Sequence, residues 1–427
     1  MSQEATERFH RIAREGLCIG CGLCEAVAGS DRIRVVKTTT GYERPVVVGE
    51  LDEDTVEHIY DVCPGTRIDG MPEREIDSAT RMDDVWGPWH RMVRAYAADP
   101  AIRFEGSTGG VLTALASYLL SSRRVAFIFH ARPSRREPTF GEAHVSFSHD
   151  DVVAGAGSRY GPTALLTQLE NVLSREQSFA FIGKPCDIAA VRNQARHDER
   201  IDRLVQYWLT PVCGGFMPPE GMKDFLERMQ VRREAIAAFR YRGRGCPGPT
   251  RIETHDGAVT EATYIDLWGV EESKWTLPWR CRICPDGIGE SADIAVSDTW
   301  IGGSPNRIES ETDPGTNAMI ARTASGAELI AAAARDGALT IEADIVPDEM
   351  SVYQTHQMHK KYEVWPRFQG LADAGYMVPQ THGLRLAQLA AQLPASTNEV
   401  EREGTRRRVS EGKAAEPTPQ AAPGALD

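Results

Sequence analysis

The nine cysteines carry the clearest chemistry in this sequence. Three follow one another at two-residue spacing in Cys18-Ile19-Gly20-Cys21-Gly22-Leu23-Cys24, and the next cysteine is Cys63, followed by Pro64. Bacterial ferredoxins hold 4Fe-4S clusters with such a run and with a more distant Cys-Pro. We therefore expect a 4Fe-4S cluster on Cys18, Cys21, Cys24 and Cys63. The alternative is structural zinc, although zinc loops usually present their cysteines in pairs.

Four further cysteines are candidates for a second cluster. They are Cys186, Cys213, Cys281 and Cys284. The last two form a C-x-x-C pair that needs two more ligands, and the first two each follow a predicted strand, at 179–182 and 204–209. Strands of an open α/β sheet deliver such residues to one rim. A zinc site, a redox-active C-x-x-C pair and plain buried thiols remain alternatives. Cys246 is left over and is interpreted as a lone structural thiol.

A glycine-rich segment directly precedes an apolar helix predicted at 109–121. Its residues are Gly106, Ser107, Thr108, Gly109 and Gly110. Free backbone N–H groups and the helix dipole would favour an anion there. The alternative is an ordinary helix start capped by Ser107 and Thr108. Because one-electron clusters need a two-electron partner, we predict that a flavin phosphate or ring lies against this loop.

Several polar residues are further candidates for the flavin site. Arg159 and Lys184 would stabilise flavin phosphates or the anionic reduced ring, unless they are only solvated surface charges. Ser158 and Tyr160 flank Arg159. Asp298 would accept a hydrogen bond from a ribityl hydroxyl or cap a turn. The sequence contains no G-x-S-x-G or H-E-x-x-H motif, which argues against hydrolases.

The pattern of predicted elements indicates an α/β fold with mixed α+β parts. Four regions are expected: a ferredoxin-like module over 1–85, a flavin-binding α/β domain over 86–225, a mixed domain over 226–392 that completes the second cluster and the flavin site, and a disordered tail over 393–427. The tail is predicted to be disordered because it has almost no large apolar residue. Within the mixed domain, 264–267 is predicted as a strand.

Composition excludes several classes of protein. The 427-residue chain has a net charge of −13, which argues against nucleic-acid binding. Residues 1–17 lack the apolar region of a signal peptide, and no apolar run approaches the length of a membrane span. These features indicate a cytoplasmic protein, in which cysteines are more often metal ligands than disulfides.

Together the motifs resemble the beta-subunit family of coenzyme F-420-reducing hydrogenases and dehydrogenases. That family includes 7-hydroxymethyl chlorophyll a reductase and a ferredoxin-dependent divinyl chlorophyllide reductase. The resemblance covers about residues 15–370. It rests on Glu105–Gly110, Gly157–Tyr160, Gly183–Asp187, Tyr241–Gly243 with Pro247-Gly248, and Cys281–Asp286 with Ala292–Ile294.

The resemblance implies FAD and a 4Fe-4S cluster on the second cysteine set, with the N-terminal cluster as a common attachment. Two residues depart from the usual family pattern: Arg159 replaces a lysine and Cys246 replaces a tryptophan. The chlorophyll-reductase branch has a different loop at 107–110, so its substrate does not transfer.

The sequence therefore predicts an iron–sulfur flavoprotein oxidoreductase. Single electrons would pass from ferredoxin or a similar donor through two 4Fe-4S clusters to FAD, which would reduce a small organic acceptor by two electrons. One alternative is an electron-transfer subunit docked on a catalytic partner, and another is a deazaflavin (F-420) oxidoreductase. A partner subunit or a homo-oligomer is compatible with each. No proton donor can be named.

Overall fold

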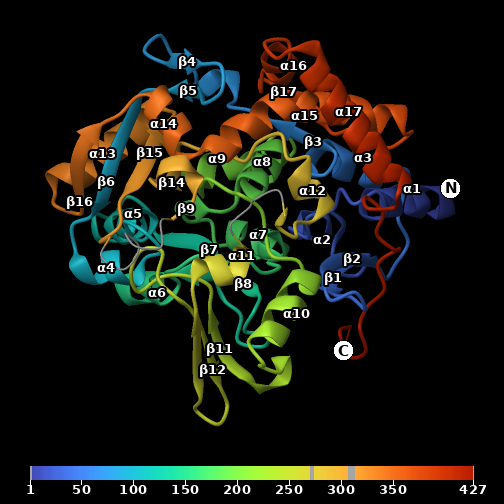
Figure 1. Cartoon of the computed structure of the whole chain (residues 1–427), viewed down its shortest axis with the longest axis horizontal. Coiled ribbons are helices and arrows are strands. Elements are labelled where there is room, and N and C mark those ends of the chain that lie inside the picture. The colour runs from blue at the N-terminus through green and yellow to red at the C-terminus, as the bar shows by residue number, and fades with distance from the viewer. Residues whose placement is uncertain (1, 270–273, 306–312, 427) are drawn as a thin grey trace.

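An eight-stranded mixed sheet forms the centre of the molecule (Figure 1). The computed structural model describes residues 2–269, 274–305 and 313–426. In sheet order the strands are β16 (Leu339–Asp344), β6 (Arg91–Ala97), β15 (Asn317–Ala321), β14 (Ile294–Asp298), β10 (Val205–Pro211), β9 (Phe179–Ile182), β7 (Phe127–Pro133) and β8 (Gly141–Ser146). The mixed α/β fold class predicted from the sequence is confirmed.

The strand directions create one functional edge. Strands β7, β9, β10 and β14 run parallel, whereas β8 at one side and β15, β6 and β16 at the other pair antiparallel with their neighbours. The carboxyl ends of β9, β10 and β14 therefore meet at the same edge. Binding sites of open α/β sheets form at such edges.

Side chains alternate between the two faces of the sheet, as the pleat requires. In β9, Phe179 and Phe181 pack on one face and Ala180 packs on the other. The face of Ala180 is covered by α5 (Val111–Ser121) and α13 (Ala324–Arg335), and the face of the phenylalanines by α7 (Leu169–Leu173), α8 (Pro185–Gln194) and α9 (Glu199–Leu204). Both faces are thus buried.

The N-terminal part forms a small module beside the sheet. Its elements are α1 (Ser2–Arg14), α2 (Leu23–Ala28), β1 (Ile33–Lys37), β2 (Glu43–Val47), α3 (Glu53–Val62) and β3 (Arg67–Asp69). Strands β1 and β2 form an antiparallel pair, and α3 begins where the Asp52 side chain accepts a hydrogen bond from Thr55 N at 2.7 Å. Strand β3 pairs in parallel with β17 (Gln380–His382), which ties the module to the C-terminal part.

A three-stranded sheet forms a smaller layer. It consists of β11 (Ile236–Arg240), β12 (Thr250–Thr254) and β13 (Val259–Ala262), packed with α10 (Pro219–Arg228) and α11 (Tyr264–Trp268). The prediction of a strand at 264–267 is wrong, because this segment forms the helix α11. Thr263 and Asp266 form a capping box, with Asp266 N donating to Thr263 Oγ1 at 3.1 Å, and this start signal outweighs the apolar composition.

The remaining short elements connect these layers. They are η1 (Glu73–Glu75), β4 (Arg81–Asp83), β5 (Gly87–Trp89), α4 (Pro100–Glu105), α6 (His149–Ala154), η2 (Leu165–Gln168), η3 (Arg233–Ala235), α12 (Trp279–Arg282), η5 (Ile301–Gly303), α14 (Pro347–Tyr353) and α16 (Leu386–Ala390). Among the helices in the described parts of the chain, none has the length and apolar character needed to cross a membrane.

The C-terminal tail differs from its prediction. Instead of being disordered, it forms α17 (Ala395–Ser410), which packs along α15 (Thr355–Asp373), and then runs beside the N-terminal module (Figure 1). Val409 is buried, and Arg367 Nε donates to Glu401 Oε2 at 2.8 Å. Ala422 N donates to Lys37 O at 2.9 Å, so the tail is ordered by contacts with distant elements. The domain boundaries at 85, 225 and 392 stay predictions.

Candidate functional site

The first cysteine set surrounds one small cavity, here named the first cysteine cavity. It is lined by Cys18, Cys21, Cys24 and Cys63. Three of these lie in the loop before α2 and in its first turn, and the fourth follows α3. Gly22 has φ of 96° and would place a Cβ 2.6 Å from Thr167 N, so a larger residue would disrupt the loop. Backbone N–H groups of Gly20 and Gly65 each point at a cysteine Sγ at 3.4 Å.

These thiols are held in an environment that disfavours their charge unless a cation is present. Burial raises the pKa of Cys18 to about 11 and raises the pKa of Cys21, Cys24 and Cys63 as well. A bound metal reverses this preference, because coordination stabilises the thiolate. Four thiols around a hollow, with N–H groups directed at sulfur, fit a cluster in which each sulfur binds a different iron.

The second cysteine set surrounds another small cavity, the second cysteine cavity. It is lined by Cys186, Cys213, Cys281 and Cys284. Cys186 lies in the first turn of α8 after β9, Cys213 follows β10, and the C-x-x-C pair lies at α12. The neighbouring strands β9 and β10 thus bring two cysteines to one edge. Cys213 is fixed by its N–H bond to Gly287 O at 2.8 Å, and burial raises its pKa to about 12. Ligation of a cluster by either set stays a prediction.

The geometry of the cysteine sets bears on the zinc alternative. Across the described ranges, no three His, Cys, Asp or Glu side chains are arranged to hold a single metal ion. The thiols instead line hollows. Cys246 is buried with Phe239 and Trp300 in another hydrophobic cluster and lines neither cysteine cavity.

A larger cavity of about 310 Å³, here the central cavity, lies at the same edge of the sheet. Its volume is within the range of small-molecule and cofactor sites. It is lined by every predicted flavin contact except Gly109, namely Gly106, Ser107, Thr108, Gly110, Ser158, Arg159, Tyr160, Lys184 and Asp298. Gly109 lies against the sheet instead, where a Cβ would come within 2.7 Å of Asn317 Oδ1. Tyr264, Trp268, Trp275 and Trp300 add aromatic surface to its wall.

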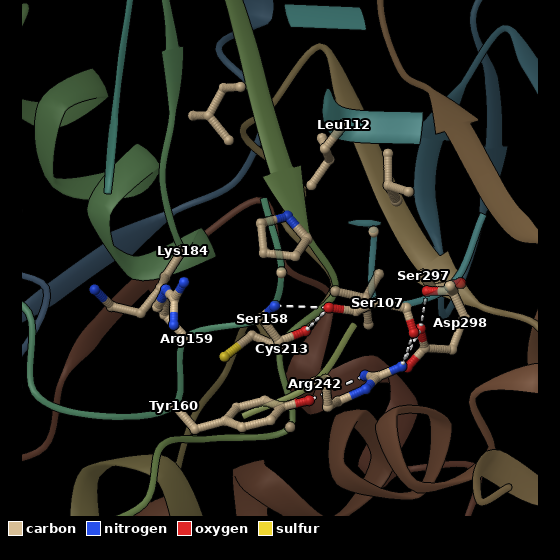
Figure 2. Close-up of a pocket in the computed structure, with 18 of the residues that line it drawn as sticks. Ser107, Leu112, Ser158, Arg159, Tyr160, Lys184, Cys213, Arg242, Ser297 and Asp298 are labelled. Atoms are coloured by element: carbon tan, nitrogen blue, oxygen red, sulfur yellow. Dashed lines mark hydrogen bonds and ion pairs between the residues drawn. The ribbon is translucent and has the colours of Figure 1, made fainter. Parts of the chain in front are cut away.

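The glycine-rich loop is held by side chains from three other segments (Figure 2). Ser158 N and Ser158 Oγ donate to Ser107 Oγ at 2.6 and 2.9 Å. Thr108 Oγ1 donates to Asp298 Oδ1 at 2.6 Å. The predicted capping of α5 by Ser107 and Thr108 is wrong, because Gly110 occupies the cap position and Asn317 Oδ1 accepts from Val111 N at 3.3 Å. The two hydroxyls fix the loop instead.

Arg242 joins the loop to the opposite wall of the cavity. Its guanidinium donates to Asp298 Oδ2 at 3.0 Å, to Ser107 O at 2.8 Å and to Tyr160 Oη at 3.0 Å. It also stacks on Trp300, with its Cζ 4.5 Å from the ring centroid. Asp298 is therefore occupied by protein donors, so its predicted role as a ribityl acceptor would use only its remaining lone pairs.

The two predicted cations line the cavity on the side away from Asp298 (Figure 2). Burial opposes the charge of Lys184, but the Asp187 carboxylate 2.7 Å from its Nζ outweighs that effect and raises its pKa. Burial lowers the pKa of Arg159 to about 10, and its buried Nε has no hydrogen-bond partner. Ser297 Oγ, beside Asp298 on the other side of the cavity (Figure 2), is buried and also unpartnered. Buried donors without a protein partner, in residues that line a cavity, fit a ligand rich in acceptors, such as a flavin with its phosphates.

The three cavities share wall residues in a fixed order. Ile19 lines both cysteine cavities, and Lys184 and Cys213 line both the second cysteine cavity and the central cavity. Arg280 in the second cavity donates to Pro64 O, next to Cys63, at 2.6 Å. The order is therefore first cysteine cavity, second cysteine cavity, central cavity.

Sequence reasoning missed most residues of the central cavity, and three polar ones stand out. Arg242, Asn317 and His356 line it but were not predicted as site residues. Arg242 stood in a segment that carried the family resemblance, which was the available signal. The other two lie far along the chain, and no local motif marks them.

Comparison with known proteins agrees with this geometry. Residues 92–170 match the N-terminal part of the family described as coenzyme F-420 hydrogenase/dehydrogenase, beta subunit, and residues 176–345 match the C-terminal part of the same family. The two matches together cover more than half of the chain.

Similar curated proteins come from methanogenic archaea. The F-420-dependent formate dehydrogenase 1 subunit beta of Methanococcus maripaludis is 26% identical over 60% of this chain and 62% of its own length. The coenzyme F-420-dependent sulfite reductase of Methanocaldococcus jannaschii is 22% identical over 75% of this chain and 47% of its own. The coenzyme F-420 hydrogenase subunit beta of Methanothermobacter thermautotrophicus is 22% identical over 59% and 84%. The chain thus spans less than two thirds of the first two relatives.

A solved structure shares the fold. It is a chain of the xenon-derivatised F-420-reducing NiFe hydrogenase complex from Methanosarcina barkeri, with a TM-score of 0.50 and 20% identity over 66% of this chain and 92% of that one. Both halves of the family are matched in sequence. The chain therefore belongs to the coenzyme F-420 hydrogenase/dehydrogenase beta-subunit family.

Proposed function

We propose that this protein is an iron–sulfur flavoprotein oxidoreductase that takes single electrons from ferredoxin or a similar donor and reduces a small organic acceptor by two electrons. The observation that carries the proposal is the order of the three cavities, in which each cysteine cavity shares a wall residue with the next site. Such an order suits two 4Fe-4S clusters leading to FAD.

The residues present fit these groups. The two cysteine sets would hold the clusters, and the glycine-rich loop, Arg159 and Lys184 would hold the flavin and its phosphates. A flavin supplies the conversion between one-electron and two-electron chemistry. Aromatic side chains form part of the cavity wall, and the Arg242–Asp298 pair keeps the loop in place.

A second candidate function follows from the names of the relatives. Two of them are named as beta subunits, and all three names include coenzyme F-420. An electron-transfer subunit on a catalytic partner, or a deazaflavin oxidoreductase, is therefore the competing proposal.

Anaerobic purification followed by cofactor analysis tests the proposal. We expect about eight iron atoms and eight sulfides per chain, as two cubane clusters require, together with one FAD. Dithionite should bleach the protein, and ferredoxin should reduce it. A colourless protein that contains zinc and no flavin would contradict the proposal.

Acceptor assays separate the two candidates. The reduced protein is mixed with coenzyme F-420 and with a panel of organic acceptors. Turnover of a non-deazaflavin acceptor by the isolated chain supports the main proposal. Reduction of F-420 alone supports the deazaflavin function, and turnover only after addition of a second protein supports the subunit function.

A further inference from the structure

A fourth cavity, of about 390 Å³, lies between α12, α15 and α17. We call it the basic cavity because of the side chains in its wall. They include Arg282, His356, Lys360, Glu363, Arg367 and Arg408. Four of them are permanently or normally cationic, and one is a carboxylate. The chain as a whole has a net charge of −13, so this local excess of positive charge is unusual for the molecule.

The cations of the basic cavity are poorly neutralised. Arg367 is paired with Glu363 and Glu401. Lys360 is only 8% exposed, yet within the described ranges it has no ion pair, and neither does Arg408. Arg282, Arg367 and Arg408 line this one cavity, so their positive charges lie close to one another. An excess of cations over carboxylates in one recess favours an anionic ligand.

The basic cavity adjoins both parts of the proposed redox site. His356 lines the basic cavity and the central cavity, and Lys360 lines the basic cavity and the second cysteine cavity. Burial lowers the pKa of His356 to about 4, so this shared wall is neutral at pH 7 and does not hold an anion itself. The basic cavity and the central cavity therefore meet at an uncharged wall residue, with Lys360 and Arg408 on the side of the basic cavity.

We propose that the basic cavity binds an anionic group, a phosphate or a carboxylate, of the same organic acceptor whose reacting end enters the central cavity. This inference rests on the proposed function and specifies its substrate class as an acidic small molecule. Arg408 and Lys360 supply the principal contacts, because neither has a carboxylate partner among the described residues, whereas Arg282, which also lacks one, donates to Trp275 O at 2.6 Å. The cavity volume is that of a small-molecule site and not of a protein interface.

Several wall residues lie outside the regions that match the family. The family matches end at residue 345, whereas Lys360, Arg367 and Arg408 come from α15 and α17. The cavity is thus completed by the segment that was predicted to be a disordered tail.

Pyrophosphate is the binding probe, and the holoprotein is the sample. Isothermal titration should show one site, and both Arg408→Gln and Lys360→Gln should weaken it about tenfold, as loss of one charge-assisted contact does. The matched control is Arg406→Gln on the same helix, where the side chain is 54% exposed and paired with Glu403 at 2.9 Å. The control should bind like the unaltered protein. Absence of binding, or equal weakening in the control, overturns the site.

A pair of quinones tests whether the anion belongs to the acceptor. The dithionite-reduced protein is oxidised by a neutral naphthoquinone or by its sulfonated, anionic analogue. Arg408→Gln should raise the KM of the sulfonated quinone several-fold and leave the KM of the neutral quinone unchanged. Pyrophosphate should compete with the sulfonated quinone and not with the neutral one. Equal effects on both quinones, or no effect on either, overturn the assignment.

The two proposals fail in different ways. Lack of flavin or iron contradicts the redox function, but the pyrophosphate titration does not depend on either group. Normal cofactor content with no pyrophosphate site contradicts only the basic cavity.

Discussion

At the scale of single residues, Arg242 is the side chain on which the central cavity depends most. It contacts the glycine-rich loop, Tyr160 and Asp298, and its own side chain is only 4% exposed. Three segments that are far apart in the sequence are therefore held in register by one guanidinium group. Lysine could not replace it, because the contacts require the planar fork.

We predict that Arg242→Gln destabilises the protein by about 3 kcal/mol, because it leaves Asp298 without its buried partner. Flavin content should fall at the same time, since the loop loses its support. Urea unfolding and flavin absorbance measure the two effects. Arg244→Gln is the control, because Arg244 is 45% exposed and paired with Glu105, and we expect a change below about 1 kcal/mol.

His130 should make stability depend on pH. It is 7% exposed beside Ser146, and burial lowers its pKa to about 4. Below its unfolded pKa of about 6.5, the unfolded chain binds a proton that the folded chain refuses, so stability falls as pH decreases from 6.5 toward 4.

Between pH 7 and pH 5.5 this one group should cost about 1 kcal/mol of unfolding free energy. In urea unfolding, the free energy of unfolding of His130→Gln should decrease less between these two pH values, by that amount. The control is His255→Gln, a change at an exposed histidine, whose free energy of unfolding should decrease as much as that of the unaltered protein. If the free energy of unfolding of His130→Gln decreased as much as that of the unaltered protein, His130 would not be the source of the pH dependence.

Sequence spacing grouped the cysteines into the two sets that line the two cysteine cavities. The cysteine sets could be grouped because their spacing is short or because each follows a strand of the same sheet. Arg242 and Asn317 could not be identified, because they reach the loop from more than 100 residues away and their roles exist only after folding. Asp298 was found, yet its partners were not.

At the scale of elements, the C-terminal tail is the feature that composition predicted wrongly. Local composition describes what a segment can bury by itself, whereas α17 is stabilised by ion pairs with α15 and by a few buried side chains. After α17 the chain continues past the N-terminal module. There Glu416 pairs in a bidentate manner with Arg44 at 2.8 Å, and Arg44 is 2% exposed.

We predict that Glu416→Ala lowers the free energy of unfolding by about 3 kcal/mol, because Arg44 is left as a buried and uncompensated charge. Glu411→Ala is the control, since this glutamate is 42% exposed and pairs with Lys413 at the surface. Denaturant unfolding compares the two. Equal stability of both variants would show that the tail is detached in solution.

At the scale of the whole molecule, the first cysteine cavity in the N-terminal module adjoins the second cysteine cavity, which in turn adjoins the central cavity. Under the proposed function, the module would be the entry for electrons and the central cavity the place of chemistry. Loss of the first cluster should therefore interrupt electron entry without emptying the flavin site.

We predict that Cys21→Ser halves the iron content, from about eight to about four atoms per chain, and abolishes reduction by ferredoxin while FAD remains bound. Cys246→Ser should keep the full iron content, since this thiol lies in neither set. Iron and flavin analysis of the purified variants provides the measurement. Loss of FAD from Cys21→Ser would show that the two sites are not separate.

The tail also has a consequence for how the protein is made. Pro419 lines the first cysteine cavity, whereas the cysteines of that cavity have all been synthesised by residue 63. A ribosome that adds about 5–20 residues per second reaches Pro419 roughly 20–70 seconds after Cys63. During that interval the wall of the cavity is incomplete, so iron and sulfide for the proposed cluster would have a period in translation to enter before the last-made segment covers the site.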